Sequence, residues 1–232
     1  MKKIVLILLL FMVGVNGSYA DIITEIQVTD DAEIEITGAD QEDVMGEDGA
    51  LADPEPSVEL EKLSLTALTA LAEKDDPEAL LALGDRYYYG KGGAGRDRTQ
   101  AFKWYLRAAE LDCTASQFNL AHMYRNGTGT KQNMQKALEW FERAAYLGDA
   151  EAQFMAAEMH GAGSGVPQNN VRAYMWYKIA YTTMEQRFRG IAKAELDMLK
   201  TEMTKDEMAQ AEALVLEWHN AQVARMQKAQ QN

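Results

Sequence analysis

The spacing of apolar residues changes at about residue 58. From Val58 onward, Ala, Leu, Met, Tyr and Trp recur three and four positions apart, which is the period of one face of an α-helix. The clearest stripe contains Ala137, Trp140, Phe141 and Ala144. The pattern therefore predicts amphipathic helices over most of the chain.

The helical pattern repeats with a fixed period. Trp104, Trp140 and Trp176 lie 36 residues apart, within the runs AFKWYLRAA, ALEWFERAA and AYMWYKIAY. A second set of runs, LGDRYYYGKG, LAHMYRNGTG and AAEMHGAGSG, precedes them. A period of this length with two helical segments per unit predicts an all-α solenoid of stacked helical hairpins. We expect each Trp to fill the space between hairpins, so that changing any of the three to Ala would cost ~3–5 kcal/mol.

Small residues mark two kinds of position in the repeat. Within the helices they recur where a large side chain would hold two helices apart, at Gly84, Ala121 and Ala157 and at Ala101, Ala137 and Ala173. Between the helices lies the stretch GKGGAG, which at first sight is typical of a phosphate-binding loop. It aligns with GTG and GSG of the next two units, and it lacks the residue order and the preceding strand of a phosphate loop. We therefore interpret these glycines as turn residues with positive φ.

These units resemble Sel-1-like repeats, which are related to tetratricopeptide repeats. The family pattern is an Ala-rich first helix, a Tyr, a Gly-x-Gly turn and then Ala-x-x-Trp-Tyr/Phe-x-x-Ala-Ala, and the second unit matches it almost throughout. The third unit departs from it, with His160 in place of the repeat Tyr and Tyr181 in place of the second Ala. The resemblance, which is to exported bacterial members, implies a right-handed α–α superhelix that recognises proteins or peptides. The family by itself implies no particular reaction.

The same comparison of units divides the chain into segments. We expect a signal peptide at 1–20, an acidic leader at 21–57, repeats at 58–181 and C-terminal capping helices at 182–227. The repeats are expected as a degenerate half repeat at 58–76 and full units at 77–113, 114–149 and 150–181. In the closing segment, Thr204 is followed three residues later by Glu207, which predicts a capping box.

The first twenty residues have the layout of a cleavable secretory signal. Lys2 and Lys3 precede an apolar run that ends at Val15, and small residues at Ser18 and Ala20 precede the expected cleavage point. The apolar run is shorter than the ~20 residues that cross a bilayer. We therefore expect cleavage after Ala20 and a periplasmic or secreted protein without stable membrane insertion. An uncleaved anchor is the alternative.

The net charge of −13 comes from one tract. Residues 21–61 hold fifteen acidic and no basic residues, whereas residues 62–232 hold twenty-one of each sign. The leader has too few apolar residues to form a core, so we expect it to be mostly disordered, although TEIQVT and EIEIT alternate as a docking strand would. Because no basic stripe is present, the charge pattern disfavours nucleic-acid binding.

Few residues could carry catalysis or bind a metal. The three histidines lack metal-ligand spacing and no nucleophile accompanies them in a known motif, so we interpret His160 as a packed core residue. Cys113 is the only cysteine, and we expect a free structural thiol, with an intermolecular bridge as the alternative. Some members of the resembled family carry cysteine pairs and have been linked to β-lactam binding, but this chain has no such pairs. We therefore predict no catalytic residues, no cofactor, no metal and no enzymatic activity.

The sequence thus predicts a non-catalytic adaptor that binds a protein or peptide on the concave face of the solenoid. Tyr88 and Tyr89 are the strongest candidates because the other units have no aromatic residues there, although packing against Lys91 or the leader is an alternative. Two other functions stay open: a cell-envelope regulator whose acidic leader acts as a lid or as a calcium-sensitive segment, and an enzyme acting on cell-wall material or β-lactams. The partner and the oligomeric state are not predicted. The full set of expected partner-binding residues, on the first helices of the units, is Asp85, Tyr88, Tyr89, Asn119, His122, Arg125, Met155 and Glu158.

Overall fold

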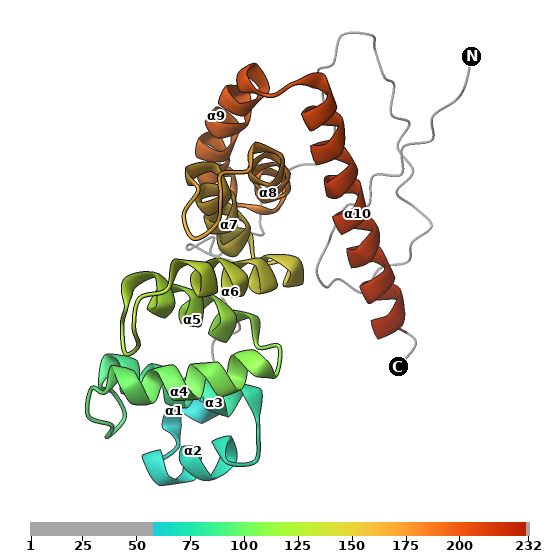
Figure 1. Ribbon diagram of the computed structural model, residues 1–232. Coiled ribbons are helices and arrows are strands. Elements are labelled where there is room, and N and C mark those ends of the chain that lie inside the picture. The colour runs from blue at the N-terminus through green and yellow to red at the C-terminus, as the bar shows by residue number, and fades with distance from the viewer. Residues whose placement is uncertain (1–57, 231–232) are drawn as a thin grey trace. The chain divides into compact units, whose positions relative to one another are not determined.

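Figure 1 shows the computed structural model of the protein, which describes residues 58–230, apart from the side chains of 58–59 and 186–188. Every regular element in this range is an α-helix, which confirms the predicted fold class. The predicted signal peptide and acidic leader lie outside the described residues. The helices are α1 (Val58–Lys62), α2 (Leu65–Ala72), α3 (Pro77–Tyr89), α4 (Arg98–Glu110), α5 (Thr114–Asn126), α6 (Met134–Leu147), α7 (Ala150–Ala162), α8 (Asn170–Thr183), α9 (Gln186–Glu202) and α10 (Lys205–Ala229).

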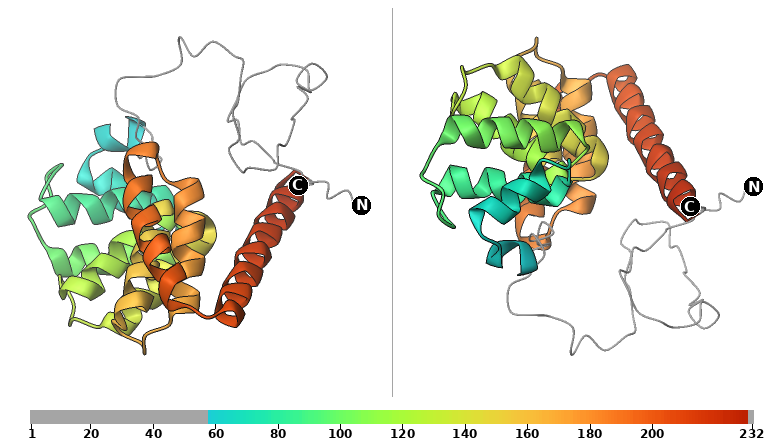
Figure 2. Two further views of the ribbon diagram at one scale, coloured as in Figure 1. Left: turned by 90° about the horizontal axis from the view of Figure 1, so that it is seen from above. Right: turned by 90° about the horizontal axis from the view of Figure 1, so that it is seen from below.

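The helices pack as consecutive pairs, as the repeat predicts. Helix α3 packs on α4, α5 on α6 and α7 on α8, and successive pairs meet through α4 with α5 and α6 with α7. Figure 1 shows these pairs stacked in chain order, and Figure 2 shows the same arrangement from above and below. Helix α2 packs on α3 at one end, whereas α9 and α10 both pack on α8 at the other. The described region is therefore a short helical solenoid.

The helix ends are set by local residues that recur with the repeat. The second helices begin after Asp97 and Asn133, whose side chains accept hydrogen bonds from backbone N–H groups of the first turn. The first helices end at Gly90, Gly127 and Gly163, with φ values of +72°, +67° and +66°. Glycine is the residue that adopts this left-handed conformation without strain. The glycine stretch after Tyr89 is thus a turn between two helices, as predicted.

Alanines and one aromatic side chain per unit form the centre of each hairpin. Ala101, Ala137 and Ala173 are each 0% exposed, and the aromatic residues Tyr105 and Phe141 are almost as deeply buried. A Cβ atom on Gly84 would lie 2.6 Å from the Tyr105 ring, well inside van der Waals contact. This geometry confirms that small residues are needed where the two helices of a pair approach.

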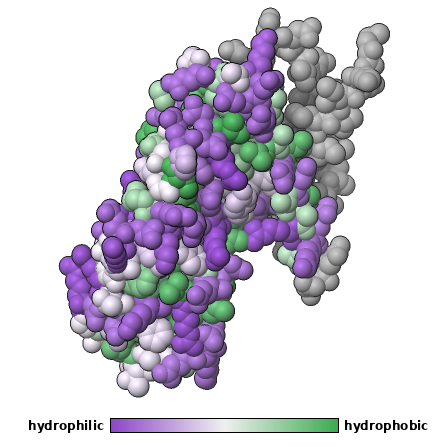
Figure 3. All heavy atoms as spheres, viewed as in Figure 1, coloured by the Kyte–Doolittle hydropathy of each residue, from purple (hydrophilic) through white to green (hydrophobic). Residues whose placement is uncertain are grey.

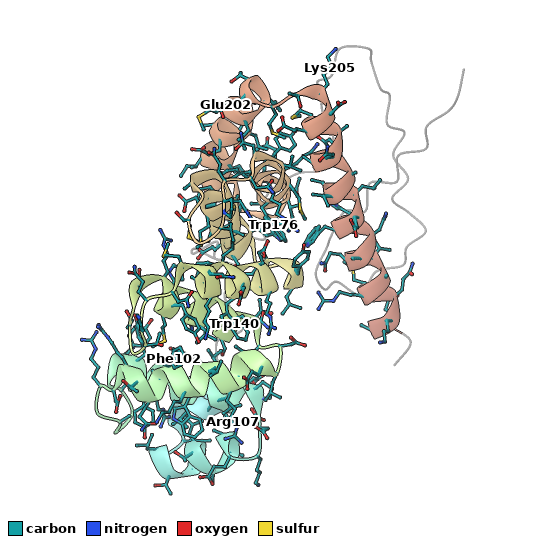
Figure 4. The ribbon with its side chains drawn as sticks, in the orientation of Figure 1. Phe102, Arg107, Trp140, Trp176, Glu202 and Lys205 are labelled. Atoms are coloured by element: carbon teal, nitrogen blue, oxygen red, sulfur yellow. The ribbon has the colours of Figure 1, made fainter. Side chains whose placement is uncertain are left out.

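The three repeat tryptophans are not equally buried. Trp176 is 0% exposed and packs edge to face on Tyr146 of the preceding pair, with 4.9 Å between ring centroids. Trp104 is only partly buried, against the cluster formed by α2 and α3, and Trp140 is likewise partly buried. Figure 4 shows Trp140 and Trp176 directed toward the neighbouring helical pair. Only Trp176 is therefore fully buried, and we now expect the stability loss of ~3–5 kcal/mol at this position and a smaller loss at Trp104 and Trp140.

Two long helices follow the last repeat. The side chain of Thr204 accepts a hydrogen bond from the Glu207 N–H, and Glu207 bonds back to the Thr204 N–H, which confirms the predicted capping box. Helix α10 buries Ala211, Val215 and Trp218. Over residues 58–230, no helix combines the length and the apolar character that crossing a membrane requires.

Candidate functional site

The residues predicted to bind a partner lie on α3, α5 and α7. Asp85 and His122 occupy the same position of the first and second units, and each contacts the aromatic core residue of its own hairpin. The hydroxyl of Tyr105 donates a hydrogen bond of 2.5 Å to Asp85 Oδ1, and the His122 ring packs edge to face on Phe141 at 5.0 Å. Burial and the neighbouring Asp85 charge raise the pKa of Tyr105, so this phenol stays protonated. The matching positions therefore form one row along successive units.

Glu158 continues this row in the third unit. It lies near Tyr177, which is the counterpart of Tyr105 and Phe141. The pKa of Tyr177 is raised, chiefly by burial and then by the carboxylates of Glu195 and Glu158. The row thus ends beside a buried phenol and next to α9, a helix that lies beyond the matching units.

Tyr88 and Tyr89 form a pair at the end of α3. Their rings meet edge to face with 5.0 Å between centroids, and Tyr89 is 58% exposed. The Lys91 ammonium lies 5.4 Å from the Tyr89 ring centroid, and the Arg98 guanidinium lies 5.7 Å from the Tyr88 ring centroid. Packing against Lys91, the alternative considered from the sequence, is therefore present. It leaves most of the Tyr89 ring open to solvent, so the binding role stays a prediction.

The predicted residues of α5 are held by neighbours on both sides. The His122 ring also packs on Phe118 at 4.6 Å, and burial followed by the Arg125 charge lowers the pKa of His122. The Arg125 guanidinium donates to Met155 Sδ of α7 at 3.1 Å, which links two successive first helices. Asn119 is half-buried on the same helix. Three of the predicted residues are therefore connected across units, whereas the tyrosine pair of α3 forms a separate group.

His160 lies in the core, as the sequence interpretation required. It is 5% exposed, and its Nε2 lies 2.9 Å from Glu142 Oε1, which also accepts from Arg172 at 3.3 Å. Burial alone would raise the pKa of Glu142, but the hydrogen bond and charge of His160, together with Arg172, outweigh it and lower this pKa. In the part of the chain that the structure describes, no group of three or more His, Cys, Asp or Glu side chains could hold a metal ion.

A pocket between α7, α8 and α9 was not foreseen from the sequence. It has a volume of about 330 Å³ and lies beside the end of the row that contains Glu158. Helix α9 contributes two further carboxylates and an apolar floor, and Figure 4 shows Glu202 near the end of that helix. The residues of α9 fall outside the repeat pattern, so no periodic signal could have assigned them to a site. The lining residues are Glu158, Gly161, Ala162, Gln168, Asn170, Tyr177, Glu195, Met198, Leu199 and Glu202.

Comparison with known proteins places this geometry in a family. The model of the Sel1 repeat matches three consecutive segments, 77–113, 114–149 and 150–182. The crystal structure of a Sel1 repeat protein from Oxalobacter formigenes is 31% identical with a TM-score of 0.51, over 57% of this chain and 96% of that one. A protective antigen of uropathogenic Escherichia coli strains with an SLR fold is 25% identical with a TM-score of 0.43, over 71% of this chain and 43% of its own.

A curated relative shares a shorter stretch. The chitin synthase regulator SKT5 of Saccharomyces cerevisiae is 38% identical over 74 residues, which are 32% of this chain. The match spans only 11% of the yeast protein. The family model matches three repeats, the helices stack in pairs, and this chain covers almost the whole of the Oxalobacter formigenes protein, so the three findings agree. Sel1 repeats generally serve as protein–protein interaction modules. The chain therefore belongs to the Sel1 repeat family.

Proposed function

We propose that the protein is a non-catalytic adaptor of the periplasm or the extracellular space. It binds a protein or peptide on the concave face of the solenoid, which we assign to the first helices of the units, α3, α5 and α7. Stacked helical pairs form an extended surface of this kind, because each unit contributes one helix to it.

The observation that carries this proposal is a set of polar, aromatic and methionine side chains on the first helices, outside the alanine core. Tyr89 is exposed, while His122, Arg125 and Met155 are half-buried and held by ring and hydrogen-bond contacts to neighbours. Tyr, Arg and Met are enriched in protein interfaces. Side chains that are already ordered, as His122, Arg125 and Met155 are, lose little entropy when a partner binds, which favours recognition.

Photo-crosslinking tests this face directly. A photoreactive phenylalanine derivative is placed at Tyr89 or Asn119 and, as a matched control, at the exposed Lys103 or Glu139 of the second helices. We expect adducts with the same partner from both first-helix positions after irradiation in cells, and none from the two controls. Adducts that come equally from both sets, or only from the controls, would contradict the assignment of the face.

The exported location is part of the proposal and rests on the N-terminal sequence. Lys2 and Lys3, the apolar run and the small residues before Asp21 are typical of a cleaved signal. N-terminal sequencing of protein recovered from the periplasm or the medium should begin at Asp21. Recovery of the full-length chain from the cytoplasm would contradict this part and would leave the binding proposal untouched.

A further inference from the structure

The pocket between α7, α8 and α9 gathers negative charge without positive charge. Glu158 of α7 and Glu195 and Glu202 of α9 line it, and no Lys or Arg is among the lining residues. Within residues 58–230, none of these three carboxylates forms an ion pair with a described cation. Each remains an acceptor that a ligand could use.

The described Lys and Arg side chains of α8 and α9, apart from Lys193, are engaged elsewhere. On α8, Arg172 bonds to Glu142, and Lys178 contacts Glu212 of α10 at 2.5 Å. On α9, Arg189 donates to the Met184 carbonyl and Lys200 pairs with Asp197. Lys193 is exposed on α9 and does not line the pocket. The surrounding protein therefore does not neutralise the three glutamates through these contacts.

A second feature points to a ligand independently of the carboxylates. Tyr177 lines the pocket and is only 5% exposed, yet its hydroxyl makes no hydrogen bond to any described residue. The counterpart in the first unit, Tyr105, bonds to Asp85 instead. The Tyr177 side chain is buried and lines the pocket, so its hydroxyl is available to hydrogen-bond a ligand that enters there. Because burial and the nearby carboxylates raise its pKa, the phenol is neutral and can accept from a donor.

The remaining lining defines the size and chemistry of the occupant. Met198 and Leu199 give an apolar floor, and the side-chain amides of Gln168 and Asn170 add further polar atoms. Among the described residues the carboxylates do not converge into a group that could hold a metal ion. A volume of about 330 Å³ admits a side chain with several methylene groups and a charged end. The acidic leader at 21–57 carries the wrong sign to occupy the pocket.

We propose that this pocket binds the side chain of an arginine of the partner protein. The guanidinium faces Glu158, Glu195 and Tyr177, and the aliphatic stem lies on Met198 and Leu199. Arginine fits better than lysine because its five N–H donors spread over a plane and can reach several separate acceptors at once. This inference rests on the proposed function as a protein-binding module and adds the chemistry of one anchor.

A small probe tests the pocket without knowledge of the partner. N-acetyl-arginine methylamide is titrated into the isotopically labelled mature protein, residues 21–232, and amide chemical shifts are followed by NMR. The matched neutral probe is N-acetyl-citrulline methylamide, which keeps the shape and lacks the charge; the lysine analogue is a third probe. We expect millimolar binding of the arginine probe, at least about tenfold weaker binding of the citrulline probe, and shifts confined to α7, α8 and α9.

Three variants separate the pocket from general charge effects. Glu195→Gln should weaken binding of the arginine probe at least about fivefold, and Tyr177→Phe should weaken it about two- to fivefold. The control is Glu139→Gln on the exposed side of α6, which removes the same charge away from the pocket and should leave binding unchanged. Tyr177→Phe keeps the packed ring and removes only the unpaired hydroxyl, so the fold is retained and this variant stays informative.

Several results would overturn the inference. These are equal binding of the arginine and citrulline probes, no shifts up to about 20 mM probe, shifts away from the pocket, and tighter binding of the lysine analogue. The adaptor proposal is tested separately, because crosslinking from Tyr89 and Asn119 does not involve the pocket. Partner adducts from Tyr89 and Asn119 of the native protein, together with no binding of the arginine probe to that protein, would refute the pocket alone. Probe binding without any first-helix adducts would refute the adaptor alone.

Discussion

Helix α5 lacks the side-chain cap that the other first helices have. Asp76 accepts a hydrogen bond from the Ala79 N–H at 2.8 Å, and Asp149 accepts one from the Ala152 N–H at 2.6 Å. Cys113 occupies the same position before α5 and makes no cap hydrogen bond. Its backbone angles, φ −67° and ψ 105°, are close to the φ −65° and ψ 115° of Asp149. An oxygen acceptor at residue 113 would therefore reach the first turn without backbone movement.

The informative perturbation is Cys113→Ser compared with Cys113→Ala. Both variants remove the thiol and its partial packing on the neighbouring clusters, but only Ser supplies a cap acceptor. An N-cap Ser is worth ~1 kcal/mol over Ala, so the Ser variant should be more stable by about that amount. For a folded region of this size, the difference corresponds to roughly 2–4 °C in the midpoint of thermal unfolding. Against the native protein the gain is smaller, because the contacts of the sulfur are lost.

Urea denaturation followed by circular dichroism measures this difference. Asp149→Ala serves as the calibration, because it removes an existing cap at the matching position and should cost ~1 kcal/mol. If the Ser and Ala variants are equally stable while Asp149→Ala clearly loses stability, the inference that a serine at residue 113 would cap helix α5 is refuted. A lower stability of Ser than Ala would show that polarity at residue 113 costs more than the cap provides.

Three further predictions concern the core. Trp176→Ala should lower the free energy of unfolding, measured by urea denaturation, by ~3–5 kcal/mol, and Trp104→Ala should lower it clearly less, because only the Trp176 indole is fully buried. Equal losses in the two variants would contradict this ranking. Gly84→Ala should cost ~1–3 kcal/mol by pushing on the Tyr105 ring, and a variant as stable as the native protein would show that the two helices separate freely. Because the folded-state pKa of Glu142 lies below its ordinary value of 4.5, its contribution is complete above that pH and is lost as the pH falls through the folded pKa. Glu142→Gln should therefore be less stable than the native protein at pH 7, with a gap in melting temperature that narrows below about pH 4, and a gap that stays constant would refute the coupling.

Local signals explain why much of the fold could be predicted from the sequence. The turn glycines Gly90 and Gly127 and the capping box that begins at Thr204 depend on residues within one turn of a helix. The alanine stripe likewise follows from the helical period, because three to four residues in every two turns must face the neighbouring helix. Repetition strengthens each of these signals, since the same requirement appears in every unit.

The candidate site was predicted less completely, because its contacts join residues that are far apart in the sequence. Asp85 and His122 were predicted to bind a partner, and the structure shows that each contacts the aromatic residue of its own hairpin. The hydrogen bond between Arg125 and Met155 joins residues 30 positions apart, and no pattern in the sequence predicts it. Glu195 comes from a helix outside the repeats, so its place beside Tyr177 was not foreseen.

The sequence by itself determined the repeat, the length of its units, the helix ends and the positions that must be small. These features depend on backbone geometry and on side-chain size at a fixed spacing, which are properties of neighbouring residues. Only the tertiary structure decided which tryptophan is fully covered, and it also assigned the partners of buried polar groups. Arg86 is an example, because its guanidinium donates to the Leu60, Glu61 and Leu63 carbonyls at 3.0, 3.0 and 2.8 Å and so fixes α1 on α3. The same holds for the acidic pocket, whose walls come from helices that meet only when the last repeat packs on α9.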